Sequence, residues 1–215
     1  MMSGLSVRRV ALRRGIRLEQ LTVAWMLIEA TLAIGAGILA RSVLLTAFGV
    51  DSVVELLSGI TLLWRLRAEQ RGEEEVRVEA AEKRAIQISA VLLVLLCGYV
   101  IASSAAGLLF GFEPQGSWLG IGVSAAALVA MPWLAWRKRV ANRAINSSAL
   151  RADIAESVTC AYLAATTLGG VFLNAVTGWW WVEYVAAVVL LVWLVPEARE
   201  AVEAALEGKI RHEGD

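Results

Sequence analysis

Residues 42–64 read SVLLTAFGVDSVVELLSGITLLW, an apolar run long enough to cross a lipid bilayer as one helix. Two acidic residues, Asp51 and Glu55, lie near its middle. A carboxylate at that depth costs about 3 kcal/mol or more unless water, a partner or an ion receives it. Residues four apart share one face of a helix, so the two carboxylates repel each other unless a proton or a cation intervenes. The pattern favours a cation site over a hydrogen-bonded structural pair.

The composition extends this pattern to the whole chain. Hydrophobic residues make up 58% of the 215 positions and charged residues only 19%, a balance that soluble domains seldom reach. The apolar residues gather in runs of about 20, the length of a membrane-spanning helix. Six runs follow one another at about residues 21–40, 42–64, 86–110, 118–136, 150–173 and 179–195. We therefore predict an all-α integral membrane protein with six transmembrane helices.

The charged segments outside these runs define the predicted domain organisation. Residues 1–20 carry arginines interleaved with apolar side chains, which is typical of an amphipathic helix on the cytoplasmic lipid surface. Residues 21–196 form the predicted six-helix transmembrane domain. Residues 197–215 suit a short cytoplasmic tail helix and are too few for a folded domain.

The basic residues predict the orientation in the membrane. All but one of the 20 lysines and arginines lie in residues 1–20, 65–84, 137–151 and 199–211, and the exception is Arg41. Segments rich in lysine and arginine stay on the cytoplasmic side. Both termini and both long loops are therefore predicted to be cytoplasmic. The protein is expected in a cell membrane, with a prokaryotic inner or plasma membrane as the preferred location.

Several function classes lack the residues that they need. Cys97 and Cys160 both lie inside apolar runs, which argues against a disulfide framework. The one histidine lies in the tail, so neither a zinc-finger pattern nor an HExxH site is present. No nucleophile–base pair is evident, and we expect neither enzymatic activity nor a nucleic-acid partner.

The fifth apolar run repeats the acidic pattern of the second. It contains Glu156 and Cys160, four residues apart and therefore on one helix face. A shift of 105 positions pairs Asp51 with Glu156 and Glu55 with Cys160. The two runs are predicted to cross the membrane in opposite directions, as the inverted repeats of many transporters do.

Depth brings these four groups close to a further acid, Glu29, in the first run. At about 1.5 Å per residue, all five fall in or near the middle third of a hydrocarbon core about 30 Å thick. Three acids and a thiol at one level predict a four-ligand site for a divalent metal, made by Asp51, Glu55, Glu156 and Cys160. Glu29 is a candidate fifth ligand or proton carrier.

On these residues the chain resembles the cation diffusion facilitators, six-helix membrane proteins that exchange a divalent metal for protons. The family's second-helix motif, a serine and leucines before two acids four apart, is similar to Ser42, Leu44, Leu45, Asp51 and Glu55. Its fifth-helix motif, Ser-x-x-Leu-x-Ala-Asp-x-x-His-x-x-x-Asp, begins alike at Ser147, Leu150, Ala152 and Asp153. Its Trp-Ala-Asp-Pro segment looks like WWWVEYVAA here, with Glu183 in the acidic place. The resemblance covers about residues 20–200.

Departures from the family pattern bear on the metal. Glu156 stands where the family has histidine, and Cys160 stands where it has aspartate. A thiolate favours zinc or cadmium, whereas carboxylates suit manganese or iron(II) equally well. We expect zinc first, and cadmium, iron, manganese and cobalt stay open.

The resemblance implies a proton-coupled exporter of a divalent transition metal, in a compact form without the family's C-terminal cytoplasmic domain. That domain would supply a dimer contact, so we expect a homodimer held by the transmembrane helices instead. The small residues between Ala102 and Gly111 are the predicted contact surface, with packing against the sixth run as the alternative. The alternative function is a non-transporting membrane protein that binds metal and regulates a partner.

Overall fold

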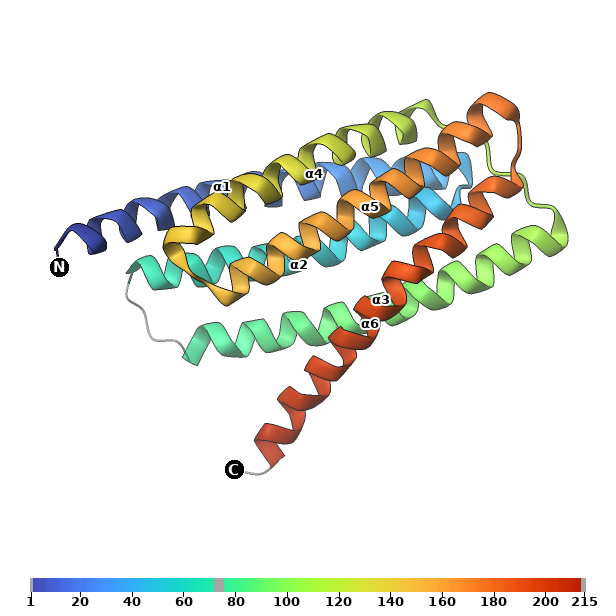
Figure 1. The fold of residues 1–215 in the computed structure, drawn as a ribbon. Helices are drawn as coiled ribbons and strands as arrows, with labels where there is room; N and C mark the ends of the chain where they lie inside the picture. Colours follow the sequence, from blue (N-terminus) through green and yellow to red (C-terminus); the bar gives the residue numbers. More distant parts are fainter. Residues whose placement is uncertain (1, 72–75, 214–215) are drawn as a thin grey trace.

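The structure is a computed structural model that describes the chain at residues 2–71 and 76–213. Six helices make up this part of the chain (Figure 1): α1 Met2–Ala40, α2 Val43–Arg71, α3 Val76–Phe110, α4 Trp118–Ile145, α5 Ser148–Thr177 and α6 Trp181–Glu213. Each contains a segment long and apolar enough to cross a membrane, and the described residues hold no strand. The prediction of an all-α membrane protein with six transmembrane helices is confirmed.

The helices pack as a group of four and a pair (Figure 1). α1, α2, α5 and α4 form a ring of neighbours, and α3 and α6 pack on each other beside α2 and α5. The connections α1–α2, α3–α4 and α5–α6 lie at one end of the bundle, which we call the turn end. Both termini lie at the opposite end with the connections α2–α3 and α4–α5 (Figure 1), and we call this the termini end.

A short turn fixes how α4 and α5 meet. Asn146 ends α4 with a φ of 57°, and its backbone N–H donates to the carbonyl oxygen of Asn142 at 2.8 Å. Asparagine tolerates this left-handed conformation better than most residues. The hydroxyl of Ser147 then caps α5 by accepting from the backbone N–H of Leu150. The turn places the termini-end halves of α4 and α5 side by side.

The predicted boundaries at residues 20 and 197 are not helix ends. α1 runs unbroken from Met2 into its membrane segment, and α6 continues past Pro196 to Glu213. Leu12 and Ile16 are buried in one apolar cluster with residues of α2, α4 and α5. The described part of residues 1–20 is therefore continuous with the first membrane-spanning helix, and Leu12 and Ile16 pack in the bundle. The far ends of the predicted segments, residues 1 and 214–215, lie outside the described residues.

The predicted dimer surface on α3 is partly used inside the molecule. A Cβ atom added at Gly107 would lie 2.2 Å from the ring of Tyr184 on α6. The Tyr184 hydroxyl also donates to the carbonyl oxygen of Phe112 at 2.6 Å. Gly107 thus lets α6 approach α3 closely, which is the alternative that the sequence had left open. Ala102 and Ala105 of the same stripe are exposed.

Candidate metal site

Three helices carry the five predicted site residues: α1 has Glu29, α2 has Asp51 and Glu55, and α5 has Glu156 and Cys160. Four of these side chains are buried, with Glu29 and Cys160 at 0% exposure, whereas Glu156 is partly exposed. The Cys160 thiol contacts Glu29, and Glu55 and Glu156 line one cavity. The structure therefore brings the predicted residues into one region.

Glu29 lies at the centre of a hydrogen-bonded group. Its Oε1 atom accepts from the hydroxyl of Ser52 at 2.8 Å and from the thiol of Cys160 at 3.7 Å. Its Oε2 atom accepts from the indole N–H of Trp25, one helical turn earlier on α1. Glu29 thus joins α1 to both α2 and α5. The sequence had predicted Glu29 at this level but not its polar partners Ser52 and Trp25.

Asp51 differs from Glu29 because its carboxylate has no hydrogen-bond partner among the described residues. Its side chain is 1% exposed, and neither carboxylate oxygen has a hydrogen-bond partner in the described part of the chain. The charged groups around it are all acidic: Glu29, Glu55, Glu156 and Glu197. A buried polar group without a partner is costly, and an ionised one far more so. Asp51 therefore needs a proton or a cation in this environment.

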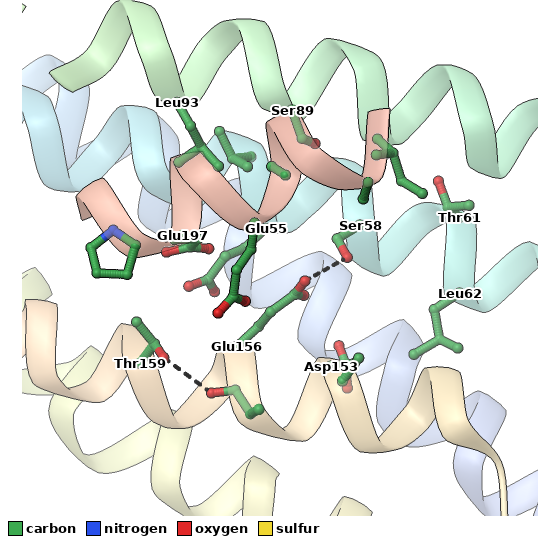
Figure 2. Close-up of a pocket in the computed structure, with 18 of the residues that line it drawn as sticks. Glu55, Ser58, Thr61, Leu62, Ser89, Leu93, Asp153, Glu156, Thr159 and Glu197 are labelled. Atoms are coloured by element: carbon green, nitrogen blue, oxygen red, sulfur yellow. Dashed lines mark hydrogen bonds between the residues drawn. The ribbon is translucent and has the colours of Figure 1, made fainter. Parts of the chain in front are cut away.

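A cavity of about 640 Å³ connects this region with the termini end of the bundle. Residues from α2, α3, α5 and α6 line it, from Glu55 and Val54 at mid-membrane depth to Arg65, Glu200 and Ala204. Figure 2 shows the side chains of Glu55, Glu156 and Glu197 directed into it. Glu156 also accepts a hydrogen bond from the hydroxyl of Ser58 at 3.2 Å. The cavity thus extends from the termini end to Glu55, one helical turn from Asp51.

Glu197 was not among the predicted site residues, because residues 197–215 were predicted to form a separate tail helix. In the structure α6 continues through this position, and Trp193, Glu197, Glu200 and Ala204 line the cavity together. Their spacing of three and four residues is that of one helix face. This spacing was a signal in the sequence that Glu197 continues the face of the last transmembrane helix.

The predicted four-ligand cage is not closed in this conformation. Within residues 2–71 and 76–213, no three His, Cys, Asp or Glu side chains converge closely enough to hold a metal ion directly. The Cys160 thiol donates to Glu29, while Glu156 accepts from the hydroxyl of Ser58 at the cavity. Like-charged carboxylates repel one another, so the uncompensated acids stay apart. The region is assembled, but its ligands do not meet.

Asp153, which the family resemblance had singled out, belongs to a buried ion cluster. Lys138 Nζ lies 2.6 Å from Asp153 Oδ2 and 2.9 Å from Glu19 Oε2. The Lys138 and Glu19 side chains are fully buried. Lys138 lies in the segment 137–151 that was predicted to be a cytoplasmic basic loop, but α4 continues to Ile145 and Lys138 is buried in the bundle. These ion pairs link α1, α4 and α5 on the side of the metal region that faces the termini end.

Glu183 accepts hydrogen bonds at the turn end of the bundle. Its Oε2 atom accepts from the hydroxyl of Ser42, and its Oε1 atom accepts from the amide of Asn174 at 2.7 Å. The same amide donates to the carbonyl oxygen of Pro114 at 3.0 Å. These hydrogen bonds link the connections α1–α2 and α3–α4 to the ends of α5 and α6 that flank the third connection. The cavity lining includes none of these residues.

A comparison with protein families finds one match over this region. Residues 20–207 of the 215-residue chain match the family model described as the cation efflux transmembrane domain. The matched range contains all five predicted site residues and Glu197. A comparison with curated proteins finds no match.

Proposed function

Since the chain belongs to the cation efflux family, we propose that it exchanges a divalent transition-metal ion from the cytoplasm for protons. Family membership and six membrane-spanning helices make it a multi-pass membrane transporter of metal cations. The proton coupling, the outward direction and the choice of metal are our proposal. The observation that carries it is the Asp51 carboxylate, which is buried, lacks a hydrogen-bond partner among the described residues and lies beyond an acidic cavity.

The proposed pathway begins at the cavity. With the termini in the cytoplasm, as the basic residues indicate, metal would arrive past Arg65 and Glu200 and reach Glu55 and Glu156. It would then be bound by Asp51, Glu55, Glu156 and Cys160, with Glu29 as fifth ligand or proton carrier. A bound dication neutralises the repulsion that now separates these acids, so it favours the closed arrangement of the cage.

Protons and metal would compete for the same atoms. Each carboxylate and the Cys160 thiol can hold either a proton or the metal, so metal binding releases protons. The metal-loaded site then opens to the other side of the membrane, where protons displace the metal. For that step the hydrogen bonds of Glu183 with Ser42 and Asn174 must break, because they hold the turn end together. One site alternately open to each face would therefore couple the two gradients.

The donor set suggests the metal. A thiol among carboxylates selects softer ions, so we propose zinc as the substrate, with cadmium next. Iron(II), manganese and cobalt suit the carboxylates and belong in any test. We also propose that the transporter is a homodimer in a cell membrane, held by exposed faces of its transmembrane helices.

The test is metal flux into proteoliposomes that contain a metal-sensitive dye and, in a parallel set, a pH dye. We expect saturable zinc flux together with proton movement in the opposite direction, and weaker flux of manganese. Metal flux without proton movement would reject the exchange mechanism. Zinc binding by the purified protein with no flux of any ion would instead favour the alternative, a membrane protein that binds metal and regulates a partner.

A further inference from the structure

We propose that Glu197 of α6 joins two of the proposed transport ligands, Glu55 and Glu156, in a capture site that holds a hydrated divalent cation before the ion loses its water and moves inward to Asp51 and Cys160. The inference rests on the proposed function and adds a residue and a step to it. The three carboxylates come from three helices, α6, α2 and α5, and are directed into one cavity (Figure 2).

Glu197 itself is poorly satisfied in its present surroundings. Its Oε2 atom is buried and has no hydrogen-bond partner among the described residues. Glu197 comes directly after Pro196 in α6, and both residues line the cavity. Three acids around one cavity repel each other, and a dication between them would remove that repulsion. An ion in the cavity would therefore supply the partner that Glu197 Oε2 lacks among the described residues.

A second observation shows where such an ion would go next. Asp51 is 1% exposed with both oxygens unpartnered among the described residues, and it lies one helical turn from Glu55, which lines the cavity. The unpartnered carboxylate of Asp51 thus lies one turn deeper in the bundle than Glu55, which lines the same cavity as Glu197. A cation held at Glu197 would be attracted onwards by Asp51, and the two acids form successive positions on one path.

The size of the cavity fits an ion that keeps its water. The described acids are too far apart to bind a metal ion directly, but water molecules can bridge an ion to carboxylates at longer range. Six waters occupy about 180 Å³ at roughly 30 Å³ each, well below the cavity volume of 640 Å³. The capture site would therefore select divalent charge, while choice among metals is left to the inner ligands, where water is lost.

The experiment compares Glu197→Gln with Glu203→Gln in proteoliposomes, by initial rates of zinc flux against zinc concentration. Glu203 is a matched control because it lies on the same helix but is exposed, pairs with Arg199 and does not line the cavity. We expect Glu197→Gln to raise the KM for zinc about five- to tenfold while kcat stays within about twofold, since one charged contact to the captured ion is lost. Glu197→Asp, which keeps the charge, should recover most of the affinity.

Ionic strength separates capture from a structural role. Added salt should raise the KM of the wild type more than that of Glu197→Gln, because the variant lacks one of the screened charges. A KM of Glu197→Gln equal to that of Glu203→Gln would overturn the proposal, and so would a loss of kcat at unchanged KM.

The proposed function and the capture site can fail separately. If the wild type transports zinc and Glu197→Gln behaves like the control, only the capture site is wrong. If the wild type transports no ion, equilibrium binding of zinc to the purified full chain tests Glu197 directly. Weaker zinc binding by Glu197→Gln than by Glu203→Gln would then support the capture site, and equal binding would overturn it.

Discussion

The thiol sulfur of Cys160 on α5 lies 3.7 Å from the Oε1 atom of Glu29 on α1. This contact joins the first and fifth helices at the level of the buried acids. Ser52 on α2 donates to the same oxygen, so one carboxylate atom is shared by three helices. Glu29 is therefore placed to exchange a proton or a ligand position with the residues of the proposed cage.

Glu29→Gln tests this role. The amide keeps the shape of the side chain and one acceptor oxygen, but it can neither release a proton nor bind a metal as a carboxylate does. We expect zinc flux about ten- to a hundredfold lower, and a weaker dependence on the pH gradient. The exposed Glu113, in the connection between α3 and α4, provides the control variant Glu113→Gln. An unchanged rate and proton-to-metal ratio in Glu29→Gln would leave Glu29 with a structural role only.

Cys160→Ser tests the thiol as a metal ligand. A hydroxyl is a harder and weaker donor than a thiolate, so cadmium flux should fall by a larger factor than manganese flux. Cys97→Ser is the control, because Cys97 is the other free thiol and is half-buried on α3. Equal losses for cadmium and manganese in Cys160→Ser would mean that Cys160 contributes packing and not metal choice.

The buried cluster of Glu19, Lys138 and Asp153 predicts a large effect on stability. Lys138→Met leaves two acids at 2.6 and 2.9 Å from the former ammonium group without their cation. Removing one partner of a buried ion pair costs about 3–5 kcal/mol, which corresponds to a fall in Tm of about 10 °C. Thermal unfolding in detergent measures this fall against Arg139→Met, an exposed neighbour. Equal Tm values for the two variants would contradict the proposed role of the cluster.

The homodimer prediction now depends on the exposed part of α3. Ala102 is exposed, whereas Gly107 packs against Tyr184 within the molecule. A single cysteine at Ala102, in a Cys97→Ser and Cys160→Ser background, should form a cross-linked dimer in membranes. Leu39, which is 78% exposed on α1, is the control position. Cross-linking at both positions alike, or at neither, would argue against a dimer formed by α3.

Much of this fold follows from local sequence signals. The six apolar runs predict the six helices, because length and hydrophobicity decide membrane spans. The acids Asp51 and Glu55 are conspicuous for the same reason, since ionisable groups are rare at that depth. The presence of a mid-membrane acidic region was therefore predictable.

Other features depend on tertiary packing that no local pattern reveals. A lysine beside arginines is typical of a cytoplasmic loop, and only the pairing with Glu19 and Asp153 makes burial of Lys138 tolerable. Glu197 lies beyond the predicted end of the sixth apolar run, but α6 continues through Pro196 and places Glu197 in the lining of the cavity. The contact between Cys160 and Glu29 likewise depends on how α1 and α5 approach across α2.

The central claim is that Asp51 binds the transported metal, and one measurement tests it most directly. Zinc flux and the opposed proton movement are recorded in proteoliposomes for the wild type and for Asp51→Ala at equal protein density. The variant should fold as well as the wild type, because it removes a buried carboxylate that has no hydrogen-bond partner in the described structure. We expect Asp51→Ala to abolish both movements while its elution in size-exclusion chromatography matches that of the wild type. Undiminished zinc flux in folded Asp51→Ala would contradict the account.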